Sequence, residues 1–419
     1  MREMKDSGIE WIKQIPTGWS TTRGKNILQL MKRPPEADDE VITCFRDGEV
    51  TLRRNRREDG FTFSDKEIGY QGIKKGDLVI HGMDGFAGAI GISDSDGKGS
   101  PVLVVCTTKE NTRYLMYYLR TLAMQDVFLA LATGIRERSC DLRWNKIADL
   151  LFPVPELNEQ CRIADYLDRK CSQIDAIIAR QQEVIEKLKA YKLSIITETV
   201  TKGLNRDIPM KNSGIEWIGE IPDHWKTAKI RNYCSLKTGA TPPTSNDEWF
   251  DGQVQWFTPG DFDVSFLLDK SKRTLSPKAL ECGVAVVAPA NTVLIVGIGA
   301  TAGKVGISAV DCSFNQQITA LLTNSVKPKF LMYWLIANTK FLRETALFTT
   351  IPILNNQTIG NYLLIFPGNT AEEERIADYL DKKCIKIDIL ITAKERIISK
   401  LATYKKNLVY EVVTGKKEV

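Results

Sequence analysis

The 419-residue chain contains two copies of one sequence plan. Residues 4–19, MKDSGIEWIKQIPTGW, and residues 210–225, MKNSGIEWIGEIPDHW, agree at eleven of sixteen positions. RIADYLDRKC at 162–171 and RIADYLDKKC at 375–384 agree at nine of ten positions. A duplication of this size predicts two structural units with the same local folds at equivalent places.

Between these matches, the halves, roughly 1–205 and 206–419, diverge. One short echo remains: RYLMYYLRT from Arg113 beside KFLMYWLIA from Lys329. Similar ends suit a shared task, such as holding the same partner twice, and divergent middles suit the reading of two different targets. Drift after duplication is the alternative interpretation, because drift also spares packed segments.

Each half ends in a long stretch with a seven-residue apolar pattern. From Glu159 to about Thr199 there is neither Pro nor Gly. Such a pattern predicts a coiled coil, and an ordinary long amphipathic helix packed on its own domain is the alternative. The predicted seam is Leu167, Ile174, Leu188 and Ile195 in the first copy, and Leu380, Ile387, Leu401 and Leu408 in the second. A second seam is predicted at Ile163, Ile177, Val184 and Tyr191, and at Ile376, Leu390, Ile397 and Tyr404.

The divergent middles combine short strands with one helix each. DLVIHG, AIGIS and PVLVVC in the first, and VLIVG, KVGIS and ITALL in the second, are typical of buried strands. Helices are predicted over 113–131 and near 330–345. The fold class is therefore α+β. The predicted division is a mixed domain at 1–155, a helical region at 156–203, a second mixed domain at 204–370 and a second helical region at 371–419.

The stretch NTVLIVGIGATAGK, residues 291–304, has the glycines of a nucleotide-binding loop. It lacks the spacing and the hydroxyl of a P-loop, and a strand, not the helix of a dinucleotide-binding turn, is predicted after it. The other half aligns VIHGMDGFAGAIGIS, residues 79–93, without a gap, with Asp84 opposite Gly299. Because a phosphate loop would not tolerate that aspartate, we predict a structural strand–turn–strand unit in both halves.

Several basic and amide groups lie in the two middles. RRNRRE, residues 53–58, is the densest basic run, and arginine clusters suit phosphates and guanine edges. A solvated loop is the alternative there, and backbone capping is the favoured alternative for the amides of FNQQ, residues 314–317. The candidate nucleic-acid contacts are Arg53, Arg54, Arg56, Arg57, Arg136, Arg138, Lys272, Arg273, Lys304, Asn315 and Gln316.

Composition argues against several classes of enzyme. The net charge of +5 permits an anionic partner without requiring one. Nine scattered cysteines without C-x-x-C fit a reducing cytoplasm, which is the predicted location. With only His81 and His224 and no known catalytic motif, the sequence predicts no metal site and no catalytic residues.

The chain resembles the specificity subunits of type I restriction–modification systems. The resemblance rests on SGIEWIGEIPDHW and its first-half partner, IADYLD in both long helices, and LIVGIGATAGKVGIS followed by SFNQQI. PVPELNEQCRIADYLD also looks like the family's entry into its helical region, whereas the second half reads PGNTAEEERIADYLD there. The resemblance covers essentially the whole chain.

The resemblance implies a non-catalytic DNA-binding subunit that recognises a bipartite asymmetric site, one half-site per domain. The two long helices would pack antiparallel. The repeated regions would dock two modification (methyltransferase) subunits, and restriction (translocase–nuclease) subunits would join them. S-adenosylmethionine, ATP and Mg²⁺ would belong to those partners, so no cofactor is expected in this chain. The alternative is a coiled-coil scaffold that binds only protein.

Overall fold

The computed structural model describes residues 2–56, 68–130, 142–262, 266–323, 325–344, 347–348 and 352–419, with 347–348 described for the backbone alone. Three predicted contacts, Arg57, Arg136 and Arg138, lie outside these residues. The chain forms two compact units, Met1–Gln182 with Glu395–Val419, and Glu183–Lys394. Each unit therefore contains one half of each long helix, where the sequence predicts separate helical regions.

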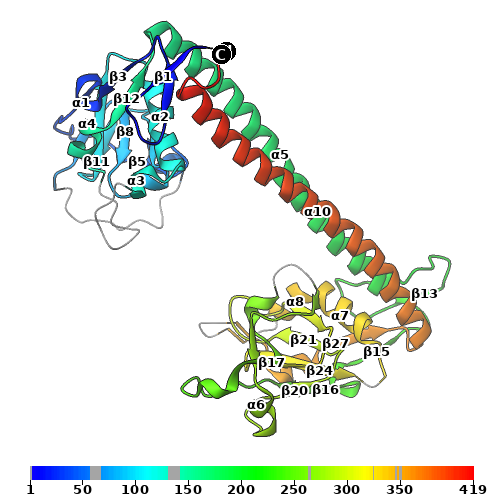
Figure 1. Ribbon diagram of the computed structural model, residues 1–419. Helices are drawn as coiled ribbons and strands as arrows, with labels where there is room; N and C mark the ends of the chain where they lie inside the picture. Colours follow the sequence, from blue (N-terminus) through cyan, green and yellow to red (C-terminus); the bar gives the residue numbers. More distant parts are fainter. Residues whose placement is uncertain are drawn as a thin grey trace. The chain divides into compact units, whose positions relative to one another are not determined.

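The first unit is built on an antiparallel four-stranded sheet of order β4-β11-β8-β9 (Figure 1). Its two-stranded pairs are β1–β2, β3–β12, β5–β6 and β7–β10. The strands are β1 (Met4–Asp6), β2 (Gln14–Pro16), β3 (Ser20–Arg23), β4 (Leu28–Leu30), β5 (Ile42–Cys44), β6 (Val50–Leu52), β7 (Gln71–Ile73), β8 (Leu78–His81), β9 (Ile90–Ile92), β10 (Gly97–Gly99), β11 (Leu103–Thr108) and β12 (Leu151–Val154). The shorter helices are α1 (Gly24–Ile27), η1 (Arg53–Asn55), η2 (Gly85–Ala87), α2 (Thr112–Met124), α3 (Val127–Ala130) and α4 (Trp144–Asp149).

The alternating side chains of this sheet reach two different cores. Leu78 and Ile80 pack against the buried face of α2 and against the long helices. Val79 and Val105 face the opposite side, where Ile42 and others of β5, β6 and β7 cover them. The sheet is thus buried on both faces, and its edges and loops remain for function.

The second unit contains two sheets, of order β16-β24-β21-β22-β18 and β19-β17-β23-β20. Its strands are β13 (Met210–Asn212), β14 (Glu220–Pro222), β15 (Lys226–Lys229), β16 (Cys234–Thr238), β17 (Phe250–Phe257), β18 (Leu267–Leu268), β19 (Arg273–Leu275), β20 (Val287–Ala288), β21 (Val293–Val296), β22 (Val305–Ser308), β23 (Cys312–Phe314), β24 (Ile318–Thr323), β25 (Leu347–Phe348), β26 (Pro352–Ile353) and β27 (Leu363–Phe366). Its shorter helices are η4 (Ile230–Asn232), η5 (Asp247–Trp249), η6 (Pro259–Asp261), α6 (Pro277–Glu281), α7 (Pro328–Ala337), α8 (Thr339–Glu344) and α9 (Asn356–Asn361). One face of the five-stranded sheet packs on α7 and the long helices, and the other packs on the second sheet.

The predicted strand–turn–strand unit is confirmed in both halves. β8 pairs with β9 through Leu78↔Ile92, and β21 pairs with β22 through Val293↔Ile307, which is the same register. The shared turn glycines Gly88 and Gly303 have φ of +94° and +88°, a left-handed conformation that strongly favours glycine. Because a strand follows each turn, these glycines shape a hairpin in both units.

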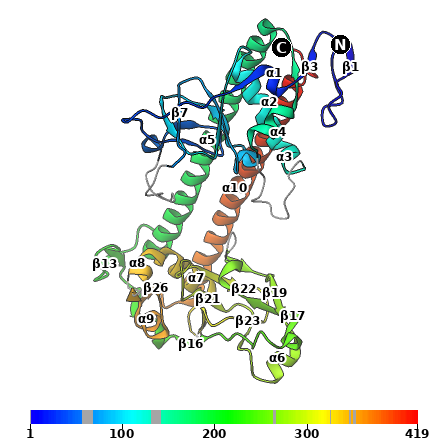
Figure 2. The same ribbon diagram turned by 90° about the vertical axis from the view of Figure 1, so that its left-hand side faces the viewer.

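The two long helices are α5 (Leu157–Lys202) and α10 (Thr370–Val413). Within each unit the first part of one helix packs beside the last part of the other, so the pairing is antiparallel (Figures 1 and 2). The first predicted seam is confirmed: Leu167, Ile174, Leu380, Ile387 and Leu408 are buried, and Leu188, Ile195 and Leu401 are half-buried.

The second predicted seam is wrong except at Ile163 and Ile376, which are buried, and at Val184, which is half-buried. Ile177 is 47% exposed and Tyr191 is 58% exposed. The seam instead uses the heptad position on the other side of the first. All the side chains at that position are buried or half-buried, and all but two lysines are apolar or small. They are Cys171, Ile178, Ile185, Lys192 and Thr199 in α5, and Cys384, Ile391, Ile398, Lys405 and Val412 in α10.

Two lysines lie in this seam, and each pairs with a carboxylate of the other helix. Lys192 is 8% exposed, and its Nζ lies 2.8 Å from both carboxylate oxygens of Asp388 on the other helix. Lys405 makes the equivalent contacts with Asp175, at 2.6 Å. A heptad position that carries lysine looks exposed in the sequence, but a partner carboxylate allows it to lie in the seam.

Neither long helix, nor any other helix in the described part of the chain, has the length and apolar character of a membrane span.

Candidate nucleic-acid interface

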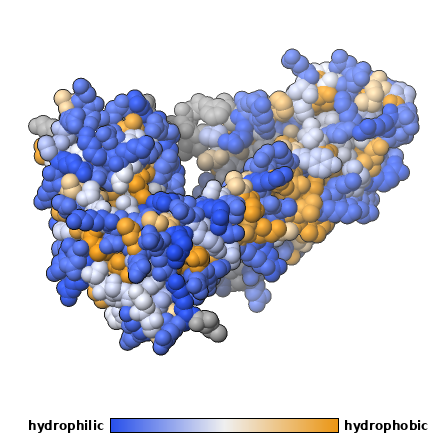
Figure 3. All heavy atoms as spheres, turned by 90° about the horizontal axis from the view of Figure 1, so that it is seen from above, coloured by the Kyte–Doolittle hydropathy of each residue, from blue (hydrophilic) through white to orange (hydrophobic). Residues whose placement is uncertain are grey.

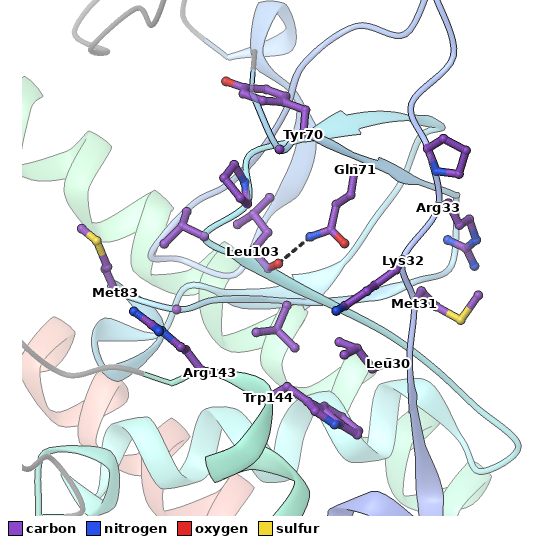
Figure 4. A pocket seen from close by; sticks show the side chains of 16 residues that line it. Leu30, Met31, Lys32, Arg33, Tyr70, Gln71, Met83, Leu103, Arg143 and Trp144 are labelled. Atoms are coloured by element: carbon purple, nitrogen blue, oxygen red, sulfur yellow. Dashed lines mark hydrogen bonds between the residues drawn. The ribbon is translucent and has the colours of Figure 1, made fainter. Parts of the chain in front are cut away.

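The first unit has an open hollow of about 1100 Å³ beside its four-stranded sheet (Figure 4). Met83 and Arg143 lie at one side, and Met31 and Lys32 lie at the other (Figure 4). Lys32 and Arg143 are exposed, whereas Trp144 and Tyr70 are half-buried. The floor is apolar and is formed by Leu30, Pro101, Val102, Leu103 and Val104.

A second hollow of about 990 Å³ shares Tyr70, Met83, Val102 and Leu103 with the first. It brings Arg53 and Arg56, two of the predicted contacts, to one surface. Because the two hollows share four lining residues, they form one continuous concave face with cations at its rim. We call this the concave face of the first unit.

Met83 is 56% exposed at the turn between β8 and β9, and His81 holds that turn. The Nδ1 atom of His81 accepts hydrogen bonds from the backbone N–H groups of Met83 and Asp84, at 3.3 and 3.0 Å. Burial lowers the pKa of His81, with Asp84 opposing this effect. The imidazole therefore stays neutral at pH 7, and Nδ1 remains able to accept.

Two arginines of the run, Arg54 and Arg56, form ion pairs within the protein. Arg54 lies 2.7 Å from Glu40, and Arg56 lies 2.5 Å from Asp47 with its guanidinium 4.3 Å from the Phe45 ring centre. The bond to Arg56 lowers the pKa of Asp47. Arg53 is half-buried against Thr43 Oγ1, at 3.4 Å. These pairs are exposed enough to be exchanged for a phosphate, since surface ion pairs contribute little.

In the second unit, Lys272 and Arg273 are both exposed on a segment with a built support. The Lys272 backbone N–H donates to Asp261 Oδ1 at 2.8 Å, and its Nζ donates to the Gly260 carbonyl. The Arg273 guanidinium lies 4.6 Å from the Phe250 ring centre and 5.2 Å from that of Trp256. Stacked arginine of this kind still presents its N–H groups outward.

The other predicted contacts of the second unit differ in accessibility. Asn315 is only 7% exposed, and its amide bonds Gln317, which is the capping arrangement that the sequence favoured. Gln316 is exposed, and its Oε1 accepts from the Thr241 hydroxyl. Lys304 is half-buried directly before β22. The contact of each with nucleic acid stays a prediction.

Sequence reasoning missed Lys32, Tyr70 and Met83, which line the concave face. Lys32 begins the run KRPP, and its neighbour Arg33 is tied to Asp77, whose hydrogen bond raises the Arg33 pKa. The basic pair before two prolines was a usable signal for an exposed loop. No sequence signal placed Tyr70 and Met83 in the lining of one hollow, because the two lie on separate loops that only the folded chain brings to one face.

Both long helices expose apolar side chains at duplicated heptad positions. On α5 these are Ile177 and Tyr191, with Val184 half-buried between them; on α10 they are Leu390, Ile397 and Tyr404, which are 41–52% exposed. We call these the duplicated stripes. Figure 3 shows hydrophobic side chains gathered in patches on a surface that is otherwise mostly hydrophilic. Unpaired apolar stripes of this length indicate a binding surface for protein.

No three His, Cys, Asp or Glu side chains converge as metal ligands in the described ranges. Burial raises the pKa of Cys44 and of Cys106 to about 12, so neither is a thiolate at neutral pH.

A family model described as "Type I restriction modification DNA specificity domain" matches residues 222–399. The second half of the chain thus carries a DNA specificity domain of the type I restriction–modification class. The type I restriction enzyme MjaVIII specificity subunit of Methanocaldococcus jannaschii is 23% identical over 430 residues, covering 96% of this chain and 94% of that protein. The MjaIX specificity subunit of the same organism is 27% identical over 194 residues, covering 44% of this chain and 43% of that protein.

Solved structures show the same fold. A chain from a structure described as the basis of complex assembly and conformational transition of the type I R-M system aligns with a TM-score of 0.73 at 16% identity, covering 96% of this chain and 99% of that one. The HsdS subunit from Thermoanaerobacter tengcongensis aligns with a TM-score of 0.50 at 17% identity, covering 96% and 98%. This chain belongs to the family of type I restriction–modification specificity subunits.

Proposed function

We propose that this chain recognises a bipartite, asymmetric DNA site, one half-site per unit, and directs methyltransferase and restriction subunits to it. The observation that carries the proposal is that the two units contain the same hairpin but present different side chains on it. The β8–β9 and β21–β22 hairpins share one register, but their equivalent positions carry different side chains. Exposed Met83 is aligned with Ile298, and buried Ala89 is aligned with half-buried Lys304. Equal scaffolds with different surface groups suit two readers of different sequences.

The concave face of the first unit suits double-stranded DNA. Exposed Lys32, Arg56 and Arg143 supply charge for phosphates, which fixes position without reading sequence. Tyr70 and Met83 supply flat and flexible apolar surface for base edges. In the second unit, Lys272 and Arg273 supply the equivalent charge, with Arg273 held on aromatic rings.

The duplicated stripes suit two copies of one partner. Ile177, Val184 and Tyr191 correspond to Leu390, Ile397 and Tyr404 under the 213-residue offset of the repeat. The same side-chain types at the same helical spacing give the same docking surface twice. We assign these surfaces to two modification subunits. S-adenosylmethionine, ATP and Mg²⁺ belong to the partner subunits in this proposal, and this chain takes no part in the chemistry.

A gel shift with the complex of this chain and its modification subunit tests the proposal. The complex should retard one bipartite sequence, identified by sequencing the methylated adenines of the host genome, and should lose affinity when either half is altered. A single base-pair change typically costs about 1–3 kcal/mol of binding free energy. Retardation that does not depend on sequence would favour the protein-binding scaffold and would refute the two-reader proposal.

A further inference from the structure

In the second unit, a long helix contacts the aromatic residue that directly precedes β18. The Nζ atom of Lys192, on α5, lies 4.2 Å from the centre of the Phe266 ring, in addition to its bidentate pair with Asp388. Phe266 precedes β18 directly and is not part of either helix. Lys192 therefore links the helix pair to the sheet region of the same unit.

A second contact, with Tyr333 of α7, also holds the Phe266 ring. Its ring meets Tyr333 of α7 edge to face, with centroids 6.2 Å apart and planes at 86°. The Tyr333 hydroxyl in turn donates to Asp381 Oδ1 of α10 at 2.7 Å. Phe266 thus contacts a cation held by one carboxylate of α10 and a phenol held by another, two helical turns apart.

The backbone at Phe266 fixes an edge of the five-stranded sheet. Its carbonyl accepts from the Ile307 N–H at 2.7 Å, and the carbonyl of Leu268 accepts from the Ala309 N–H at 2.8 Å. The chain then passes Ser271, which is buried and bonded to Gln255, and reaches Lys272 and Arg273. Only short, anchored backbone separates the ring under Lys192 from the proposed DNA contacts.

The first unit has a different residue at the position of Phe266. The Val50 carbonyl accepts from the Asp94 N–H in the first unit, and the Leu268 carbonyl accepts from the Ala309 N–H in the second, so Val50 and Leu268 are equivalent. Two residues earlier in the chain, Gly48 therefore occupies the position that Phe266 has in the second unit. A Cβ at Gly48 would lie 2.0 Å from an Arg120 Nη atom, so the Arg120 guanidinium fills that space. The Tyr117–Asp168 and Lys405–Asp175 contacts are retained, at 2.7 and 2.6 Å. The repeat therefore supplies an internal control for the lysine.

We propose that Lys192 is a positioning residue for DNA recognition by the second unit, acting through Phe266 on the segment that presents Lys272 and Arg273. The lysine serves two roles at once, as a seam ion pair and as a support beneath the recognition surface. Lys405 serves only the first. This inference rests on the proposed function, because it assumes that the second unit reads one half-site.

Three substitutions in the full chain, co-purified with the modification subunit, test the inference. Lys192→Met removes the charge but keeps a side chain that packs on an aromatic ring. Phe266→Leu removes the ring and keeps the Lys192–Asp388 pair, so it remains informative if Lys192→Met folds poorly. Lys405→Met removes the duplicated ion pair and serves as the matched control.

The measurement is competition gel shift against duplexes with one base pair changed in either half of the site. Lys192→Met and Phe266→Leu should each reduce discrimination about three- to tenfold, the effect of a lost cation–π contact, in the half that the second unit reads. Discrimination in the other half should stay within about twofold of the wild-type value. Lys405→Met should keep discrimination in both halves within the same limit.

Two results would overturn the inference. One is unchanged discrimination in both halves for Lys192→Met and Phe266→Leu, and the other is an equal loss for Lys405→Met. If the wild-type complex itself failed to discriminate, the proposed function would fall first, and the inference with it. Wild-type discrimination with no half-specific effect of the variants would refute the inference alone.

Discussion

Gln160 and Glu373 occupy equivalent places in the two halves, and both are fully buried. Gln160 accepts from the Asn111 N–H at 2.9 Å and donates to the Pro155 carbonyl at 2.9 Å. Glu373 Oε2 accepts from the Lys327 N–H at 2.7 Å, but Oε1 has no hydrogen-bond partner among the described residues. The duplication has thus replaced an amide that donates with a carboxylate that cannot.

We predict that Glu373→Gln stabilises the protein at pH 8 by about 1 kcal/mol, because an unsatisfied buried group costs about 1–3 kcal/mol. Burial raises the Glu373 pKa, so the folded state binds its proton more tightly than the unfolded state does. The wild-type contribution is present below the unfolded pKa and is lost as pH rises through the folded pKa. The gain in thermal midpoint should therefore be present at pH 8 and fade near pH 4.

Gln160→Glu is the matched reverse substitution. It should lower the midpoint at pH 8, because it places a carboxylate beside the Pro155 carbonyl and Glu110, both of which accept from Gln160 Nε2. Equal midpoints for wild type and Glu373→Gln at pH 8 would contradict the argument.

Arg54 allows a test of the predicted arginine run. Arg54 is 59% exposed and pairs with the 47% exposed Glu40, so Arg54→Ala should scarcely alter stability. If Arg54 contacts phosphate, the variant should bind all sequences more weakly and the slope of log affinity against log salt should fall by about one. A loss confined to one sequence would instead assign Arg54 to a base, and an unchanged slope and affinity would remove it from the interface.

At the scale of elements, the sequence predicted both long helices and one of their two seams. Leu167 and Ile174 were identified because apolar residues recur there every seven positions. The other seam could not be chosen from the pattern, since both candidate phases are mostly apolar with one lysine in each helix: Lys170 and Lys383 in the predicted phase, and Lys192 and Lys405 in the observed one. The neutralisation of Lys192 by Asp388 depends on the antiparallel register, which no single helix encodes.

The phase of the seam gives a prediction on two residues three positions apart. Ile174→Ala should destabilise the protein by about 2–5 kcal/mol, because Ile174 is 6% exposed and its removal leaves a cavity. Ile177→Ala, at a side chain that is 47% exposed, should change stability by less than about 1 kcal/mol. Denaturant unfolding of both variants checks this. An equal loss in the two would restore the seam predicted from sequence.

At the scale of the whole molecule, the sequence predicted the duplication, the α+β class and the matching hairpins. It did not predict how the compact units divide the chain. The sequence places boundaries where motifs begin, near residues 156 and 371. Packing instead assigns Glu395–Val419 to the first unit, and within α5 the change from the first unit to the second falls between Gln182 and Glu183. Each unit is completed by the far end of the other half's helix, so contacts between sequence-distant segments define it. Those contacts are tertiary and leave no local signal.

This division determines what a recognition-domain exchange should do. Residues 226–370 contain β15 to β27 and, apart from Thr370 at the start of α10, leave both long helices with their seam and duplicated stripes unchanged. Replacing them with the corresponding residues of another specificity subunit should alter one half of the methylated site, because the first unit's concave face is untouched. Sequencing of methylated adenines reads both halves at once, and exchange of residues 20–155 is the matched control, which should alter the opposite half. A change in both halves from either exchange would mean that the two units read DNA jointly and that the duplication does not separate their tasks.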